Sequence, residues 1–152
     1  MKSPRAKVLV INGPNLALLG KRQPEIYGRY TLEDICNQMI AVAEKENIQL
    51  DFFQSDSEGE IVTRIGQAKD NYDFIIINPA GYTHTSVAIR DAIEAVNIPC
   101  IEVHLSNIYK REEFRHRSLI AGVCLGQIAG FGKDSYILAV MAISRMLKSA
   151  ES

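Results

Sequence analysis

Residues 8–28 read VLVINGPNLALLGKRQPEIYG, and this stretch indicates the fold. The first four residues are apolar and three of them are β-branched, as in a strand that is covered on both faces. The residues from 12 onward are too rich in turn formers to be a helix or a strand, so they predict a long loop. In open α/β sheets, such loops at the carboxyl ends of strands carry the chemistry, and this loop holds Asn12, Asn15, Arg22 and Tyr27.

The rest of the chain alternates apolar runs with helical patterns. Further strands are expected at residues 48–53, 74–77, 99–103 and 123–128. Helices are expected from Thr31, with Asp34 completing a capping box, from Asp56 or Ser57, and over residues 86–96 and 135–148. Because strands alternate with helices, we predict one α/β domain over residues 1–152. Its doubly wound, five-stranded parallel sheet would lie between two helical layers, as a flavodoxin-like three-layer α/β/α sandwich.

Composition and charge exclude several classes of protein. The 152 residues carry a net charge of −1 and their basic residues are dispersed, so we expect no nucleic-acid or membrane partner. No apolar stretch approaches the length of a membrane span or a signal-peptide core, which favours a soluble, cytoplasmic protein. Cys36, Cys100 and Cys124 are odd in number and form no C-x-x-C pair, so we interpret them as buried, reduced core residues.

Three polar loops are expected to meet at the carboxyl edge of the sheet. Glu102 and His104 are two apart on a predicted strand, so their side chains project from the same face, opposite Ile101 and Val103. A carboxylate beside a histidine can fix its tautomer and raise its basicity, which suits a general acid near neutral pH. The loop after the expected strand at 74–77 holds Asn78, Gly81, Thr83 and His84. The loop after the strand at 99–103 holds Ser106 and Asn107.

The sequence contains no motif typical of a phosphate-binding loop, a metal site or a nucleophilic serine. The glycines near the first strand form neither G-x-G-x-x-G nor G-x-x-x-x-G-K-[ST], so a phosphate loop fits poorly. No cluster has metal-ligand spacing and no serine occupies a nucleophile elbow. We therefore expect acid–base chemistry with no cofactor and no metal. The charged residues between Arg111 and Arg117 are interpreted as the exposed face of a short helix.

Three motifs together resemble one enzyme family. They are NGPNLALLGKRQPEIYG at residues 12–28, NPAGYTHTSVAIRDA at 78–92 and IEVHLSNIYKREEFR at 101–115, and they look like the type II 3-dehydroquinate dehydratases. The resemblance covers nearly the whole chain. It implies a flavodoxin-like fold, a dodecamer built from trimers, and dehydration of 3-dehydroquinate to 3-dehydroshikimate without a metal or a covalent imine. This lyase reaction serves aromatic amino-acid biosynthesis through the shikimate pathway or the breakdown of quinate, and both roles stay open.

The resemblance also implies catalytic roles. Tyr27 would be the base that removes a proton from the carbon next to the ketone, and Arg22 would favour its tyrosinate. A phenol with a pKa of about 10 needs such a cation to act as a base at neutral pH. His104, supported by Glu102, would protonate the departing hydroxyl, and Asn15 would stabilise the enolate through a bound water.

The resemblance further implies the residues that bind substrate. Asn78, His84 and Arg115 would contact its hydroxyls, Leu105 and Ser106 would hold its carboxylate, and Asp91 would reach a neighbouring subunit's site. Residues 20–28 would form a lid that brings Arg22 and Tyr27 into place. Ala17 and Gln23 stand where the family usually has Asn and Glu, which bears on lid behaviour rather than on the type of reaction.

Two hypotheses of other classes remain open. A flavodoxin-like module could bind a flavin or a nucleotide at the same edge of the sheet. An assembly protein could carry the fold with a decayed site, although the intact set of Arg22, Tyr27, Glu102 and His104 argues against this.

Overall fold

The computed structural model describes residues 3–151, apart from the side chain of Tyr27. Its centre is a five-stranded sheet with the order β2-β1-β3-β4-β5, and every neighbouring pair is parallel. The strands are β1 (Ala6–Asn12), β2 (Ile48–Gln54), β3 (Phe74–Asn78), β4 (Cys100–His104) and β5 (Gly126–Ala129). The predicted parallel sheet is therefore confirmed.

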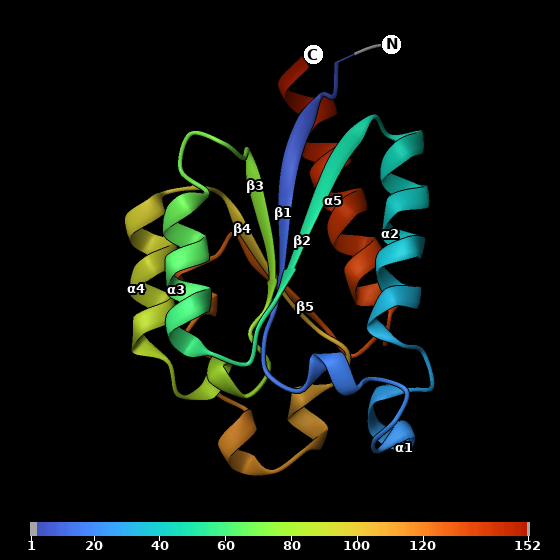
Figure 1. The fold of residues 1–152 in the computed structure, drawn as a ribbon, viewed down its shortest axis with the longest axis vertical. Helices are drawn as coiled ribbons and strands as arrows, with labels where there is room; N and C mark the ends of the chain where they lie inside the picture. Colours follow the sequence, from blue (N-terminus) through green and yellow to red (C-terminus); the bar gives the residue numbers. More distant parts are fainter. Residues whose placement is uncertain (1–2, 152) are drawn as a thin grey trace.

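Helices cover both faces of this sheet (Figure 1). Helices α2 and α5 enclose one apolar core with β1, β3 and β4, and α3 and α4 enclose the other. The helices are α1 (Pro24–Tyr27), α2 (Leu32–Lys45), α3 (Glu58–Gln67), α4 (Val87–Val96) and α5 (Asp134–Glu151). The two cores account for the continuous apolar runs of the central strands, and they confirm the three-layer α/β/α sandwich.

The helix starts follow the signals in the sequence. The Thr31 hydroxyl accepts a hydrogen bond from the backbone N–H of Asp34, and the Asp34 carboxylate accepts one from the N–H of Thr31. Ser57, rather than Asp56, caps α3, and Ser86 caps α4. Each cap satisfies a backbone donor that the first helical turn would otherwise leave unpaired.

Three expectations about local structure need correction. Strand β5 begins at Gly126 rather than at residue 123, because Ala121–Val123 closes into a 3-10 turn first. The loop after β1 contains a 3-10 turn (Leu16–Leu18) and the short helix α1. The charged segment near Arg115 is not a helix with one exposed face but two 3-10 turns, Ile108–Lys110 and Glu113–Arg115, which fold back over the end of the sheet.

The cysteines also depart in part from expectation. All three are unpaired, and Cys100 on β4 is buried as predicted. Cys36 and Cys124 are only half-buried, because Cys36 lies beside the apolar stripe of α2 and Cys124 follows a turn at the edge of the sheet. Within residues 3–151, no helix combines the length and the apolar character needed to cross a membrane.

The strand order creates a crevice between β1 and β3. From β1 the chain runs to α2 on one face of the sheet, whereas from β3 it runs through the 3-10 turn Ala80–His84 to α4 on the other face (Figure 1). The loops after β1 and β3 therefore diverge at their carboxyl ends. Such a switch point is where open α/β sheets bind their ligands.

Candidate active site

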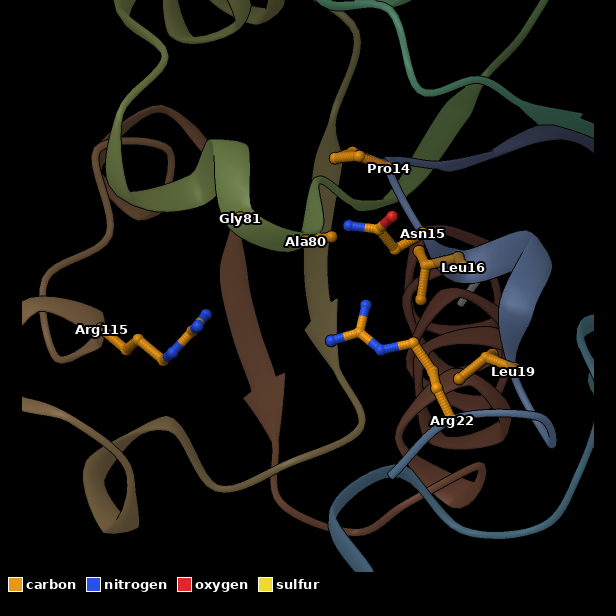
Figure 2. Close-up of a pocket in the computed structure, with 8 residues that line it drawn as sticks. All are labelled: Pro14, Asn15, Leu16, Leu19, Arg22, Ala80, Gly81 and Arg115. Atoms are coloured by element: carbon orange, nitrogen blue, oxygen red, sulfur yellow. The ribbon is translucent and has the colours of Figure 1, made fainter. Parts of the chain in front are cut away.

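Two adjoining hollows open at this switch point. The outer hollow is lined by Pro14, Asn15, Leu16, Leu19, Arg22, Ala80, Gly81 and Arg115 (Figure 2). The inner hollow is lined by Leu16, Asn78, Ala80, Gly81, His84, His104, Leu105, Ser106, Ile108, Arg111 and Arg115. Four residues, Leu16, Ala80, Gly81 and Arg115, line both. The two hollows therefore form one continuous site.

Glu102 and His104 form the innermost pair of this site. They project from the same face of β4, as predicted, and Oε2 of Glu102 lies 2.5 Å from Nε2 of His104. Glu102 is fully buried and His104 is only 6% exposed. Burial raises the pKa of Glu102, but hydrogen bonds from His104 and Ser118 outweigh it and leave that pKa below its usual value. The carboxylate is therefore ionised at neutral pH and accepts the Nε2 proton, so Nδ1 is the ring nitrogen left for a ligand.

A buried tyrosine joins the ends of β1 and β3. Asn12 and Asn78 are in register on the two strands, and the Tyr136 hydroxyl of α5 lies between their side chains. This hydroxyl donates to Oδ1 of Asn12 at 2.6 Å and accepts from Nδ2 of Asn78 at 2.8 Å. Oδ1 of Asn78 accepts from the backbone N–H of Ala80, which starts the turn over the inner hollow. Tyr136 thereby fixes the side chains of Asn12 and Asn78 at the base of the crevice.

The loop after β1 is held close to the turn after β3. A Cβ atom at Gly13 would lie 2.6 Å from the carbonyl oxygen of Pro79, so only glycine fits there. Asn15 has a left-handed backbone (φ 68°), and its N–H donates to the carboxylate of Asp56. With its backbone fixed in this way, Asn15 points its amide into the outer hollow (Figure 2).

Arg22 and Arg115 face each other across the outer hollow (Figure 2). Arg22 also donates to the side chain of Gln23 at 3.0 Å, and Arg115 to the carboxylate of Glu112 at 3.0 Å. Arg22 lies in the predicted lid, whose ends, Gly20 and Gly28, have φ values of 84° and 85°. Tyr27 ends helix α1 in this segment, and its side chain lies outside the part of the chain that the structure describes.

His84 reaches the inner hollow from the turn after β3. Its Nδ1–H donates to the carbonyl oxygen of Arg117 at 2.9 Å, which fixes the ring. Burial lowers the pKa of His84, and the neighbouring charges of His104 and Arg115 act in the same direction. The ring is therefore neutral at pH 7, with Nε2 as an acceptor suited to a hydroxyl group.

Most of the predicted site residues come together here. The structure places Asn15, Arg22, Asn78, His84, His104, Leu105, Ser106 and Arg115 on the walls of the two hollows, with Glu102 behind His104. Two predicted residues are not among them: Asp91 is exposed on α4 and lines neither hollow, and the side chain of Tyr27 lies outside the part of the chain that the structure describes. Among residues 3–151, no group of three or more His, Cys, Asp or Glu side chains could hold a metal ion.

Sequence reasoning missed Arg111 as part of this site. Its guanidinium lines the inner hollow and lies 3.5 Å from the Ser106 hydroxyl. The dense charge around it had favoured an exposed helical face. The sequence did contain one indication of its role: Arg111 follows Ser106 by five positions, and Ser106 is predicted to bind the substrate carboxylate. An arginine close to that residue is suited to binding the same carboxylate. With Arg22, three arginines border the site, which favours an anionic ligand.

Comparisons with known proteins identify the family of this chain. Residues 6–144 match the family model described as dehydroquinase class II. A 3-dehydroquinate dehydratase from Sulfurovum sp. (strain NBC37-1) is 57% identical over 141 residues, which cover 93% of this chain and 87% of the relative. Another, from Francisella philomiragia subsp. philomiragia, is 60% identical over 134 residues, covering 88% and 91%.

A solved structure gives the same result for the fold. The crystal structure of a type II dehydroquinase from Propionibacterium acnes superposes with a TM-score of 0.89 at 41% identity, covering 95% of this chain and 98% of that one. The resemblance carried by the three sequence motifs is thereby confirmed. On the family match, on the identity to these relatives and on the shared fold, this chain belongs to the class II dehydroquinase family.

Proposed function

We propose that this chain catalyses the reversible elimination of water from 3-dehydroquinate to give 3-dehydroshikimate. One observation carries this proposal: the buried Glu102–His104 pair opens onto the inner hollow, which Arg111 and Arg115 border, and Arg22 borders the adjoining outer hollow. That arrangement combines a proton donor with binding groups for a carboxylate. The names of the relatives, which are 3-dehydroquinate dehydratases, agree with it.

Tyr27 is the proposed base. Its phenolate takes the proton from the carbon next to the ketone, and the electron pair of that C–H bond forms an enolate. Arg22 lies five positions earlier in the same glycine-bounded segment and directs its guanidinium into the outer hollow (Figure 2). We propose that this cation stabilises the Tyr27 phenolate when the lid closes. The buried Tyr136 is unsuited to this role, because burial raises its pKa well above the ordinary value.

His104 is the proposed acid. When the enolate collapses, the bond to the hydroxyl breaks and the imidazolium gives its proton to the departing oxygen, so the products are water and a conjugated enone. The Glu102 carboxylate holds Nε2 and stabilises the imidazolium, which leaves Nδ1–H as the donor. Asn15, whose amide points into the outer hollow, stabilises the enolate oxygen through a bound water (Figure 2).

The remaining site residues bind and orient the substrate. Asn78, His84 and Arg115 contact its hydroxyls from the inner hollow. The backbone amides of Leu105 and Ser106, together with the Ser106 hydroxyl, hold its carboxylate, and Arg111 adds a positive charge beside that hydroxyl. Residues 20–28 close as a lid over the bound substrate.

We extend the proposal to assembly and location. The chain acts as one catalytic domain in a dodecamer built from trimers, in which the exposed Asp91 on α4 reaches a neighbouring subunit's site. Its three unpaired cysteines suit a reducing compartment such as the cytoplasm. The reaction belongs to the shikimate pathway.

The test is the ultraviolet absorbance of the conjugated enone when chelator-treated protein is mixed with 3-dehydroquinate. We expect a rise that Tyr27→Phe reduces by about 10²–10⁴-fold, as for other general bases. Tyr109→Phe is the matched control, because Tyr109 is 62% exposed and lines neither hollow. No rise from folded, assembled protein would refute the proposal and favour a flavin- or nucleotide-binding module. Full turnover by Tyr27→Phe would refute the role of Tyr27 alone.

A further inference from the structure

The charge of Glu102 depends on the donors that surround it. Its side chain is fully buried, and a buried carboxylate stays ionised only where hydrogen-bond donors replace water. Besides His104, two hydroxyls provide such donors. Thr83 Oγ1 lies 3.1 Å from Oε2, and Ser118 Oγ lies 2.8 Å from Oε1 and 3.0 Å from Oε2.

Ser118 differs from Thr83 because its hydroxyl has a single possible orientation. Its oxygen accepts two backbone hydrogen bonds, from the N–H of Ile120 at 3.2 Å and from the N–H of Ala121 at 2.9 Å. Both lone pairs are therefore occupied, and the one proton is directed at Glu102. Because Oγ lies within hydrogen-bond distance of both carboxylate oxygens, it also restricts rotation of the carboxylate and keeps Oε2 on His104.

We propose that Ser118 is a positioning residue for the dehydration proposed above: it holds Glu102 ionised and oriented, so that His104 keeps its Nε2 proton and presents Nδ1 to the substrate. Ser118 lines neither hollow, so it acts through Glu102 and not on the substrate. This inference rests on the proposed function and adds a residue to it that the motif comparison did not single out.

The surroundings of Glu102 contain few groups that could replace this hydroxyl. The titratable groups that act on it or feel its charge are His104 and Cys100 on its own strand and His84 on the turn after β3. Its register partners on the neighbouring strands are Ile77 on β3, which is apolar, and Gln127 on β5, whose side-chain amide also acts to lower the pKa of Glu102. Without the Ser118 hydroxyl, burial would raise the pKa of Glu102 with one less donor to oppose it.

The test compares Ser118→Ala with Ser118→Thr, which keeps a hydroxyl on the same carbon. For Ser118→Ala we expect kcat to fall about 10- to 100-fold while KM changes less than about threefold, as when an interaction of the transition state is lost. The pH at which the Glu102 carboxyl protonates, followed by 13C NMR, should move up by about one unit, because the carboxylate has then lost one donor. Ser118→Thr should restore kcat to within about threefold. Ser144→Ala, which removes another buried hydroxyl far from Glu102 in sequence, should leave kcat and the Glu102 titration unchanged.

The possible failures are distinguishable. If the unmodified protein forms no enone, the proposed function fails and this inference fails with it. If the unmodified protein is active and Ser118→Ala keeps its kcat and its Glu102 titration, only the role of Ser118 is overturned. A loss of kcat with an unmoved Glu102 titration would likewise overturn it, since general loosening lowers activity without changing the charge of Glu102. Should Ser118→Ala not fold, Ser118→Cys, with a weaker donor of similar size, is held to the same two criteria.

Discussion

The hydroxyl of Tyr136 lies 2.6 Å from Oδ1 of Asn12, although the two residues are 124 positions apart in the sequence. The same hydroxyl accepts from Asn78, so one side chain of α5 joins the ends of β1 and β3 where the crevice opens. Burial raises the pKa of Tyr136, which keeps the hydroxyl protonated and able to donate. The floor of the site therefore depends on a helix that contributes no residue to either hollow.

Tyr136→Phe should lower the free energy of unfolding by about 1–3 kcal/mol. The change keeps the packing of the ring but leaves the buried amide groups of Asn12 and Asn78 without their partner. Urea denaturation measures the loss. The control is Tyr30→Phe at a side chain that is 45% exposed, which we expect to stay within about 0.5 kcal/mol of the unmodified protein. Equal stability of the two variants would contradict the role given to Tyr136.

Gly13→Ala should destabilise the protein by about 1–3 kcal/mol, as overpacking does elsewhere. The added Cβ would lie 2.6 Å from the carbonyl oxygen of Pro79, a backbone atom that cannot move without shifting the turn over the inner hollow. Gly66→Ala is the matched control: it lies inside α3 with open space around its Cβ position, and alanine should stabilise the helix there by about 0.5–1 kcal/mol. Thermal unfolding of both variants should therefore show shifts of opposite sign. A Gly13→Ala protein that melts at or above the unmodified protein would refute the close contact.

Acidification should destabilise the fold in two successive windows. The pKa of His84 is lowered below 6.5, first by burial, so its contribution is complete above pH 6.5 and is lost as the pH falls through the folded value. The pKa of Glu102 lies below 4.5, because the hydrogen bonds from His104 and Ser118 outweigh the effect of burial. Its contribution is complete above pH 4.5 and is lost at still lower pH.

Urea midpoints measured from about pH 7.5 to about pH 3.5 check this order. The variant His84→Asn should reduce the decline in the upper window, and Glu102→Gln should reduce that in the lower one. A stability that rises as the pH falls through either window would contradict the prediction, because it would mean that the folded protein binds protons more tightly than the unfolded one.

Arg111→Gln should lower kcat/KM for 3-dehydroquinate by about tenfold, the cost of a lost charged hydrogen bond. Arg111 lines the inner hollow beside Ser106, where the substrate carboxylate is proposed to bind. Lys110→Gln removes the same charge one residue earlier, at an exposed side chain that lines neither hollow. Steady-state kinetics at one ionic strength compare the two variants. If Lys110→Gln costs as much as Arg111→Gln, the effect is general steering of an anion and not local binding.

Local pattern was sufficient wherever a structural element depends on neighbouring residues. The alternation of apolar runs and helical stripes predicted the parallel sheet and both helical layers, and the Thr31 capping box is present as expected. The two-residue spacing of Glu102 and His104 predicted their pairing, because alternate side chains of a strand share a face. The motifs also identified most of the residues on the walls of the hollows.

Local pattern failed where long-range contacts decide the structure. Strand β5 begins later than its apolar run suggests, because the chain first completes the turn Ala121–Val123 and pairs with β4 only from Gly126 onward. The sequence pattern predicts that Arg111 is a solvent-exposed charge. In the structure, the turns within residues 108–115 place it on the wall of the inner hollow. No sequence pattern links Ser118 to Glu102 across 16 positions.

The sequence by itself determined the class of fold, the family and the chemical types present at the carboxyl edge of the sheet, because periodicity and motif spacing are local properties. Only the tertiary structure decided which groups control the charge and orientation of those residues. Ser118 donates to Glu102, the partner of His104, and Tyr136 donates to Asn12. Strand pairing and helix packing bring these residues together from distant segments. The energy of a buried hydrogen bond depends on that three-dimensional arrangement and on the exclusion of water, neither of which is encoded in any single stretch of the chain.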